Sequence, residues 1–262
     1  MTTLEPRQAI QAFIDETITG TELARALVSW PNWNVPAQLD QSGTPGVSRF
    51  VTPNGERFFR LFSDGGAIDE LRAAEGDDAV GPHFVETSGW WAFGQLTDDL
   101  QWVDINPKCK ADIHYRQPQF EMLREMARAV RIEGILGDMA HAQSEDELAH
   151  AGGADDPMAA VREYEGYRIV LQESGEDDFQ LVLAPDTKNR LLAAVFTAAD
   201  TLQAFLNDRT ELLDGNHRSV TVDGKTLFAQ LKQIELQGLV FNCSGPIRPA
   251  ALASQFLDLV LP

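Results

Sequence analysis

Cys243 is the residue of this chain best placed, by its sequence context, to act as a nucleophile. It directly follows the apolar phrase "LQGLVFN" at residues 236–242, so we expect it at the end of a buried strand. A thiolate there could attack a substrate if a neighbouring base lowered its pKa. His217 is the only histidine in residues 158–262, and nothing in the spacing links the two residues. An inert, buried thiol is the favoured interpretation, and Cys243 remains only a candidate reactive site.

The histidines form no recognisable metal motif. The sequence has no His pair at i, i+4, no HExxH and no Cys-x-x-Cys. His141 lies three residues after Asp138, but such pairs are common on acidic helices that bind no metal. The phrase "SDGG" at 63–66 lacks the lysine and glycine spacing of a phosphate-binding loop, so it favours the start of a helix. We therefore predict no metal, no cofactor and no assembled catalytic site.

Two asparagines end similar apolar phrases, "LQWVDIN" at 100–106 and "LQGLVFN" at 236–242. Asn106 and Asn242 fit the chemistry of turns, because the asparagine side chain readily bonds nearby backbone groups. The alternative interpretation is a pair of polar groups beside a ligand crevice at strand ends, by analogy with open α/β sheets. The turn interpretation is favoured.

The two phrases belong to a longer series of matched segments. "GWWAFGQL" at 89–96 matches "GKTLFAQL" at 224–231, and "LFSDGGAIDEL" at 61–71 matches "VFTAADTLQAF" at 195–205. "RFVTP" also matches "LVLAP", and "WPNW" matches "YEGY", with partners about 132 to 136 residues apart throughout. A colinear series of this length indicates an internal duplication.

Periodicity predicts the elements of the second copy. Alternating segments at 167–173, 179–184 and 219–224, with the apolar runs 191–196 and 238–242, read as strands. Thr197 is expected to cap one helix, residues 225–234 to form another with Ile234 facing inward, and Pro249 to begin a closing helix. We therefore predict the α+β class, with two tandem units of the type α-β-β-β-α-β-α-β-α related by a pseudo-twofold.

The predicted boundaries follow from this repeat. Residues 1–20 form an N-terminal helix, 21–134 the first copy and 158–262 the second. The segment 135–157 between them contains a stretch without lysine or arginine, which makes it an acidic linker. Ser144 followed by Glu147 forms a capping box, so part of the linker should be helical.

The order "V-x-V-D-G-K-x-L-F-x-x-L", then "GLVFN" and a loop of small residues, resembles the SseB-like family, whose names refer to enhanced serine sensitivity and type III secretion. The resemblance covers residues 166–258 and, more weakly, 30–125. Asn106-Pro107 keeps the family's Asn-Pro, whereas the second copy has Asn242-Cys243. The resemblance implies a fold and a regulatory or interaction role, with no catalytic residues to transfer and no reason to inherit the secretion label.

The charge balance restricts the partners. Forty acidic and 21 basic residues give a formal net charge of −19, which disfavours nucleic acid and anionic membranes. No secretory signal, spanning segment or disulfide framework is recognisable, which predicts a cytoplasmic protein. Trp90 and Trp91 align with polar Lys225 and Thr226, so their indoles are expected to contact the other copy, a second subunit or a foreign protein.

These features favour a cytoplasmic, non-catalytic interaction or regulatory protein with a protein partner, and they are compatible with self-association. The rival hypothesis is an enzyme or small-molecule binder with a site between the copies, using Cys243, Asn106 or Asn242. A third is an immunity-type protein that masks a basic partner, as the acidic charge would suit.

Overall fold

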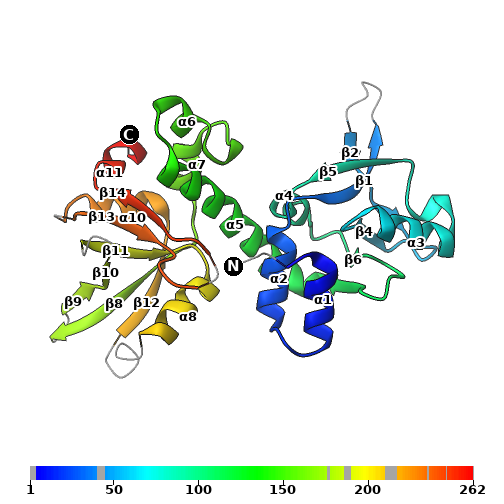
Figure 1. Cartoon of the computed structure of the whole chain (residues 1–262), viewed down its shortest axis with the longest axis horizontal. Coiled ribbons are helices and arrows are strands. Elements are labelled where there is room, and N and C mark those ends of the chain that lie inside the picture. Colours follow the sequence, from blue (N-terminus) through cyan, green and yellow to red (C-terminus); the bar gives the residue numbers. More distant parts are fainter. Residues whose placement is uncertain are drawn as a thin grey trace. The chain divides into compact units, whose positions relative to one another are not determined.

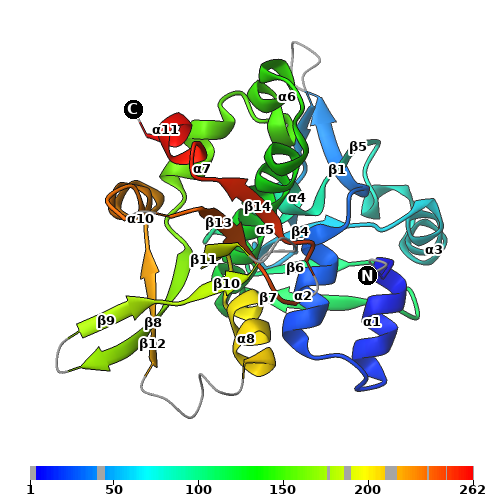
Figure 2. The same cartoon turned by 60° about the vertical axis from the view of Figure 1, so that its left-hand side comes forward.

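The computed structural model describes residues 4–39, 45–175, 178–185, 190–209, 217–234, 236–245 and 247–261. The chain divides into two compact parts, an N-terminal unit of residues 2–130 and a C-terminal unit of residues 131–262 (Figure 1). Each combines helices with mostly antiparallel strands, so the α+β class predicted from the sequence is confirmed. Figure 2 shows the same elements from a second direction.

The N-terminal unit contains two groups of paired strands. Its elements are α1 (Pro6–Ile14), α2 (Gly20–Ser29), β1 (Trp33–Leu39), β2 (Pro45–Val47), β3 (Phe50–Val51), β4 (Arg57–Leu61), α3 (Gly65–Glu75), η1 (Asp77–Ala79), β5 (His83–Thr87), α4 (Gly89–Gly94), β6 (Trp102–Ile105), β7 (Ile113–Arg116) and η2 (Gln117–Gln119). One sheet has the order β2-β1-β5 and the other β3-β4-β6-β7, in which β4 and β6 are parallel. A single antiparallel bridge between Asn34 and Phe62 joins them. Helix α5 (Phe120–His141) crosses the boundary between the units.

The C-terminal unit contains one seven-stranded sheet. Its elements after α5 are α6 (Glu145–Ala149), η3 (Ala151–Gly153), α7 (Pro157–Glu163), β8 (Tyr167–Gly175), β9 (Asp178–Leu181), β10 (Leu183–Pro185), β11 (Leu191–Phe196), α8 (Ala199–Asp208), β12 (His217–Val222), α10 (Gly224–Leu231), β13 (Gly238–Phe241), β14 (Ala250–Ala253) and α11 (Phe256–Val260). The main path is β12-β8-β11-β13-β14, with β9 beside β8 and β10 beside β11. Among the described strands of this unit, only β11 and β13 are parallel.

From α2 and α7 onward, the described α-helices and strands of the two units follow one another in the same order. β1 pairs with β2 and β5 as β8 pairs with β9 and β12, and β4 pairs with β3 and β6 as β11 pairs with β10 and β13. We refer to residues at equivalent places in these registers as counterparts.

Two glycines illustrate the correspondence. Gly89 begins α4 and Gly224 begins α10, and their N–H groups donate to Trp30 O and Tyr164 O at 2.7 and 2.8 Å. A Cβ on Gly89 would lie 2.4 Å from Val28 O, and one on Gly224 would lie 2.6 Å from Arg162 O. Glycine is therefore required at both helix starts, because the backbone of α2 approaches Gly89 directly and the backbone of α7 approaches Gly224 directly.

Each unit has its own apolar core around a buried aromatic residue. Trp33 donates its indole N–H to Leu27 O at 2.9 Å, and its counterpart Tyr167 donates its hydroxyl to Val161 O at 3.0 Å. Both rings are fully buried, so the hydrogen bond satisfies the one polar group that each ring takes into the core. The recurrence of aromatic character noted in the sequence therefore reflects core packing.

Several predicted elements are confirmed. Residues 238–241 form the buried strand β13. Asp64 in "SDGG" caps α3 by accepting the N–H of Ala67 at 2.9 Å. Ser144 likewise accepts the N–H of Glu147, so the predicted linker is helical at α6.

Other predictions were wrong. The element order lacked two strands in each unit, because residues 179–185 divide into β9 and β10 and the segments after β6 and β13 add β7 and β14. Residues 250–253 were expected to belong to a closing helix that begins at Pro249, but they pair with β13 and alternate between buried and exposed. Helix α10 ends at Leu231, which leaves Ile234 half exposed rather than inward. Ala198, not Thr197, is the N-cap of α8.

Candidate functional site

Asn106 and Asn242 lie at the ends of the parallel strand pairs. Their backbone N–H groups donate to Leu61 O and Val195 O, each at 2.9 Å, and both residues have φ of 51°. Asparagine tolerates this left-handed conformation better than most residues. Both side chains are buried, so each asparagine completes the end of a strand pair from inside the unit.

The side-chain oxygens of these asparagines bind the neighbouring strand. Asn106 Oδ1 accepts the N–H of Ser63 at 2.8 Å, and Asn242 Oδ1 accepts the N–H of Thr197 at 3.0 Å. Asn242 also donates from Nδ2 to Thr197 Oγ1 at 2.9 Å. Asn106 Nδ2 is buried without a hydrogen-bond partner among the described residues. These contacts give both asparagines a structural use that needs no ligand.

A hydroxyl beside each asparagine contacts a carboxylate. Ser63 Oγ donates to Asp64 Oδ2 at 2.7 Å, and Thr197 Oγ1 donates to Glu133 Oε1 at 2.6 Å. A hydroxyl paired with a base is the arrangement that activates a nucleophile. Ser63 and Thr197 are nevertheless buried, so a substrate could not reach either hydroxyl without rearrangement. We therefore interpret the Ser63–Asp64 and Thr197–Glu133 hydrogen bonds as structural contacts that orient the ends of the strands.

Asp64 is also the centre of an ion-pair group that binds α1 to α3. Arg7 donates from Nε and Nη2 to both oxygens of Asp64 and from Nη1 to Glu70, all at 2.9 Å. Burial by itself raises the pKa of Asp64, but the hydrogen bonds from Ser63, Arg7 and the Ala67 N–H outweigh it and lower that pKa. The hydrogen bond from Arg7 lowers the pKa of Glu70 as well.

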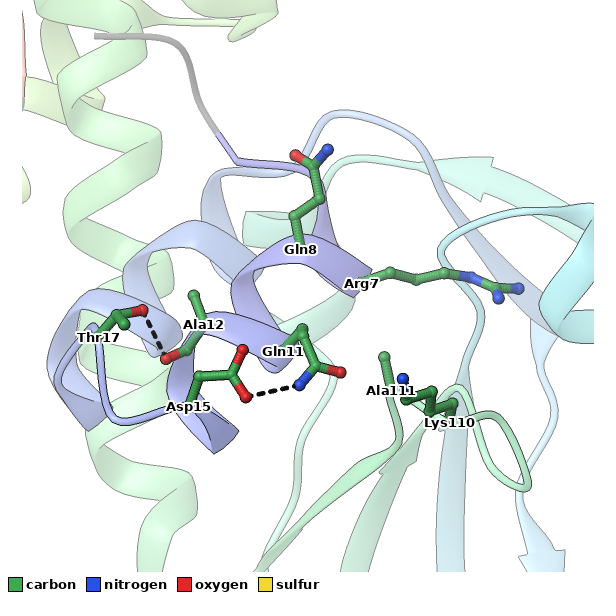
Figure 3. A pocket seen from close by; sticks show the side chains of 8 residues that line it. All are labelled: Arg7, Gln8, Gln11, Ala12, Asp15, Thr17, Lys110 and Ala111. Atoms are coloured by element: carbon green, nitrogen blue, oxygen red, sulfur yellow. Dashed lines mark hydrogen bonds between the residues drawn. The ribbon is translucent and has the colours of Figure 1, made fainter.

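A concave surface of about 530 Å³ lies beside Arg7 (Figure 3). Its lining residues are Arg7, Gln8, Gln11, Ala12, Asp15, Thr17, Lys110 and Ala111. Gln11 donates to Asp15 and Thr17 donates to Ala12 O, each at 2.9 Å. Much of the polar lining is therefore bonded to its own helix or turn, and Arg7 is bonded to Asp64 and Glu70.

Neither cysteine has the environment of a reactive thiolate. Burial raises the pKa of Cys243 to about 11, and burial together with the Glu70 carboxylate raises the pKa of Cys109 to about 12. Strands β8 and β11 separate β12, which carries His217, from β13, which precedes Cys243. Three strand spacings place those strands roughly 14 Å apart. The arrangement therefore does not bring Cys243 and His217 together as a catalytic pair.

Asp138 and His141, the pair considered as metal ligands from the sequence, both make local contacts with backbone atoms. Asp138 accepts the N–H of Gly152 at 2.9 Å, while His141 Nδ1 contacts Gly137 O at 2.6 Å. No group of three or more His, Cys, Asp or Glu side chains that could hold a metal occurs within the described residues. The described residues also include no helix that is long and apolar enough to cross a membrane.

Trp90 and Trp91 lie in the short helix α4. Both are half-buried and pack against the core of the N-terminal unit, whereas Lys225 and Thr226 in α10 are exposed. Part of each indole is therefore accounted for by its own unit. Their predicted contact with a partner stays a prediction.

A second aromatic feature was not recognised from the sequence. Phe50 on β3, Phe58 on β4 and Trp102 on β6 form a stacked row, here called the aromatic row, with ring centroids 5.4 and 4.8 Å apart. The Arg60 guanidinium lies 4.9 Å from the ring centroids of Phe50 and Phe58. Phe50 and Trp102 are half-buried, so the row is partly open to solvent.

The row occupies the sheet face opposite the core. Phe59 and Val103, which alternate with its members, are buried in the N-terminal core. Arg116 on β7 is exposed and lies directly opposite Trp102 in the register, and the same alternation places it on the face of the row. This face therefore combines aromatic rings with guanidinium groups.

The counterparts of these residues are small or aliphatic. Phe50, Phe58 and Trp102 correspond to Ala184, Leu192 and Gly238, and Arg60 and Arg116 correspond to Ala194 and Ala253. Ala184, Leu192 and Ala194 are buried in a cluster that includes Leu202, Phe205 and Leu206 of α8. The same strand arrangement thus forms without an aromatic row.

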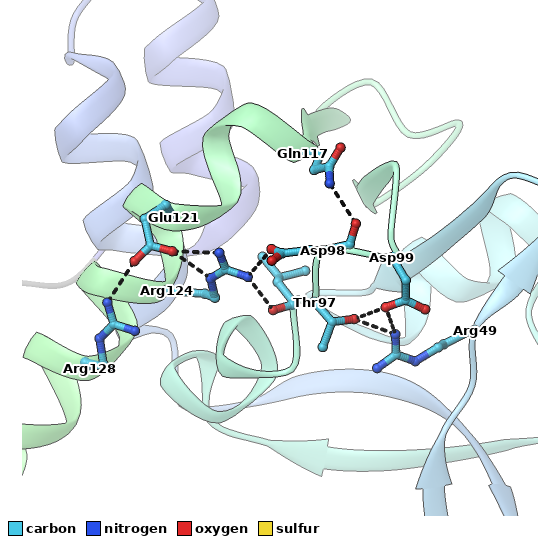
Figure 4. Close-up of polar contacts among 9 residues, drawn as sticks. Arg49, Thr97, Asp98, Asp99, Gln117, Glu121, Arg124 and Arg128 are labelled. Carbon is cyan, nitrogen blue, oxygen red and sulfur yellow. Dashed lines mark hydrogen bonds and ion pairs between the residues drawn. The ribbon is translucent and has the colours of Figure 1, made fainter.

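Polar contacts gather around residues 97–99, shortly before β6 (Figure 4). Asp99 binds Arg49 at 3.1 Å and Arg57 at 2.9 Å, while Asp98 binds Arg124 at 2.8 Å. Hydrogen bonds from Thr97 and Arg57 lower the pKa of Asp99 to about 2. Glu121 pairs with Arg124 and Arg128 on α5. These contacts connect the edge of the aromatic row to the first turns of α5.

No protein-family model matches this sequence. No curated protein sequence matches it either. Among solved structures, Anabaena Tic22, described as a protein of protein transport, is similar over 83% of this chain and 88% of its own, with 11% identity and a TM-score of 0.22. A similarity of this size carries no argument about the fold or function of this chain.

Proposed function

We propose that this chain is a non-catalytic protein-interaction or regulatory protein of the cytoplasm, built from two SseB-like units in tandem. One observation carries the proposal: the N-terminal unit has the aromatic row with Arg60 where its counterpart has Ala184, Leu192, Gly238 and Ala194. Because the strands pair in the same way with small residues, the row is not needed for strand pairing. Partly open aromatic and arginine side chains are typical of interfaces between proteins.

The chemistry of the strand ends supports the same proposal. Asn106, Asn242, Ser63 and Thr197 are buried and bonded to the backbone or to each other. Cys243 is protonated at neutral pH, because burial raises its pKa to about 11. Asn106, Asn242 and Cys243, which the sequence offered as a possible ligand or reactive site, are therefore better explained by strand closure and packing.

The first test is affinity capture of the tagged full chain from its own host's lysate, at low and moderate salt. We expect one partner in a near-stoichiometric amount. A defined reaction catalysed by the isolated protein, or capture without any partner at either salt concentration, would contradict the proposal.

Capture also tests Trp90 and Trp91, the contact surface that the sequence predicts. The Trp90→Ala/Trp91→Ala variant is compared with Lys225→Ala/Thr226→Ala, which changes the counterpart positions. Loss of the partner with the first variant alone assigns the interface to α4. If both variants retain the partner, the interface lies elsewhere on the molecule.

A further inference from the structure

β14 is the last strand of the C-terminal sheet, and among the described strands only β13 pairs with it. The outer edge of such a strand presents backbone N–H and C=O groups that can bind another strand. Apart from the pairing with β13, residues 250–253 make no hydrogen bond within the described part of the chain. β14 therefore has an open hydrogen-bonding edge.

The other terminal strands of three or more residues carry side chains that discourage pairing. Charged residues and proline act in this way, because they place a charge at the edge or remove an N–H from it. The residues concerned are Pro45 in β2, Glu86 in β5, Arg116 in β7 and Arg218 in β12. β14 has the same four-residue length as β7 but consists of alanine and leucine alone. Its edge is therefore left unprotected where the counterpart edge is not.

The direction of the free backbone groups follows from the pairing. In the N-terminal unit, Gln117 N–H donates to Gln101 O at 3.0 Å, which sets the alternation of hydrogen-bonded pairs between β6 and β7. The counterpart register then makes Leu252 the residue of β14 that bonds to β13. The N–H and C=O groups of Ala251 and Ala253 consequently point to the open edge.

A close approach within the C-terminal unit agrees with this alternation. A Cβ on Gly238 would lie 2.4 Å from Leu252 O. A carbonyl that accepts the N–H of Leu239 lies against the Cα of the preceding residue, which is Gly238. Leu252 O is therefore directed at β13 and not at the open edge.

The segment around this edge is uncharged. No Asp, Glu, Lys or Arg occurs in residues 249–257, although these four types make up 23% of the chain. The flanking charges are Arg248 and Asp258, and Asp258 pairs with Lys232 at 3.0 Å. A strand that adds to β14 therefore buries no charge of β14 and meets none directly opposite.

We propose that β14 pairs with β14 of a second copy of this chain, antiparallel and about a twofold axis, so that the two C-terminal sheets become continuous. Pairing centred on Leu252 places Ala251 of each copy opposite Ala253 of the other, with about four backbone hydrogen bonds between them. Both alanines are exposed and small, so they allow the strands to approach closely. Because the segment is its own complement, a second copy is preferred to another partner. The proposal goes beyond the proposed interaction function and does not depend on it.

Sedimentation of the full chain from about 1 µM to about 1 mM tests the dimer, because a short strand pair gives a weak association. The average mass should rise from 28.9 kDa toward twice that value. Each copy carries a formal net charge of −19, so added salt should strengthen the dimer by screening the repulsion between copies. Monomers at every concentration, or a dimer that salt dissociates, would overturn the proposal.

Two variants with the same change of net charge locate the contact. Ala251→Lys/Ala253→Lys places ammonium groups opposite each other across the twofold axis and should weaken the dimer by about tenfold or more. Ala73→Lys/Ala74→Lys, at exposed positions of α3, should leave the dissociation constant within about twofold. Equal effects of the two variants would contradict the assignment to β14.

Amide hydrogen exchange of the unaltered chain gives a test that depends on no variant. Exchange at Ala251 and Ala253 should slow by about tenfold or more as the dimer forms, because their N–H groups become bonded. Leu252 should be protected at every concentration, and Arg116 on the counterpart edge should exchange at one rate throughout. A dimer in which Ala251 and Ala253 exchange as fast as in the monomer uses another surface, which would refute the proposal.

The capture experiment separates this dimer from the proposed function. A partner that is retained by Ala251→Lys/Ala253→Lys, while self-association is lost, supports the dimer as a separate property. A chain that is monomeric throughout, and whose captured partner this variant releases, has a foreign strand at the edge of β14. That result would overturn the dimer and leave the interaction function standing.

Discussion

Asn106 and Asn242 adopt the same φ of 51° and occupy equivalent places in their units, yet within the described part of the chain only Asn242 has a hydrogen-bond partner for its Nδ2. The difference begins at the neighbouring hydroxyl. Thr197 Oγ1 faces Asn242, whereas Ser63 Oγ donates to Asp64, which also accepts from Arg7. The N-terminal unit thus uses its hydroxyl to orient the cap of α3.

This difference predicts unequal costs for removing the two side chains. Asn242→Ala should lower the free energy of unfolding by about 1 to 3 kcal/mol, because the Thr197 N–H loses its acceptor and alanine is strained at positive φ. Asn106→Ala should cost about 1 kcal/mol less, since it also removes a buried, unpartnered amide. Urea unfolding measures both. A larger loss for Asn106→Ala would contradict the assignment of the orphaned Nδ2.

The glycines at the two helix starts give a second prediction. Gly89→Ala and Gly224→Ala should each destabilise the protein by more than about 2 kcal/mol, because the new Cβ meets backbone oxygen at 2.4 or 2.6 Å. Gly94→Ala is the matched control, since Gly94 ends α4 in open space. There the better helix propensity of alanine should be neutral or favourable. Thermal unfolding compares all three, and similar melting temperatures for Gly89→Ala and Gly94→Ala would be inconsistent with the close approach.

Local patterns in the sequence predicted most strands, and the reason is visible in residues 238–241. That short apolar run is flanked by turn residues and is buried on both faces, so pattern and structure agree. Residues 250–253 show the limit. Their alanines favour a helix locally, but pairing with β13 makes them a strand. Tertiary pairing overrode propensity there.

The candidate site was less predictable because its members are distant in sequence. Phe50, Phe58 and Trp102 become neighbours only through the registers of β3, β4 and β6. Alternation along β4 puts Phe58 and Arg60 on one side of the strand, but it does not show what lies beside them. The sequence offered one signal of the aromatic row: Trp102 in "LQWVDIN" stands where "LQGLVFN" has Gly238.

The ion pairs of Arg7 predict an acid-sensitive stabilisation. Asp64 and Glu70 have pKa values below their ordinary values of about 3.9 and 4.3. Carboxylates whose pKa is lower in the folded state stabilise it above the unfolded pKa, and this contribution is lost as the pH falls through the folded pKa. Arg7→Gln should therefore lower the melting temperature at pH 7 by a few degrees and much less at pH 3. Because the groups are partly exposed, 1 M salt should also reduce the difference.

Arg128→Gln serves as the control for the Arg7 experiment. Arg128 is exposed and makes its ion pair with Glu121 on its own helix, so its loss should matter less at pH 7. A melting difference for Arg7→Gln that stays constant between pH 7 and pH 3 would show that the two carboxylates are not its source.

The cysteines provide the sharpest test against a catalytic thiol. With pKa values raised to about 11 and about 12, Cys243 and Cys109 should be alkylated by iodoacetamide at pH 7.5 more than about a hundredfold more slowly than an unperturbed thiol. Both should react at the ordinary rate once the protein is unfolded in guanidinium. Mass spectrometry of tryptic peptides follows each cysteine separately. Rapid, selective alkylation of Cys243 in the native protein would show a thiolate that this environment does not support, and it would restore the enzymatic hypothesis.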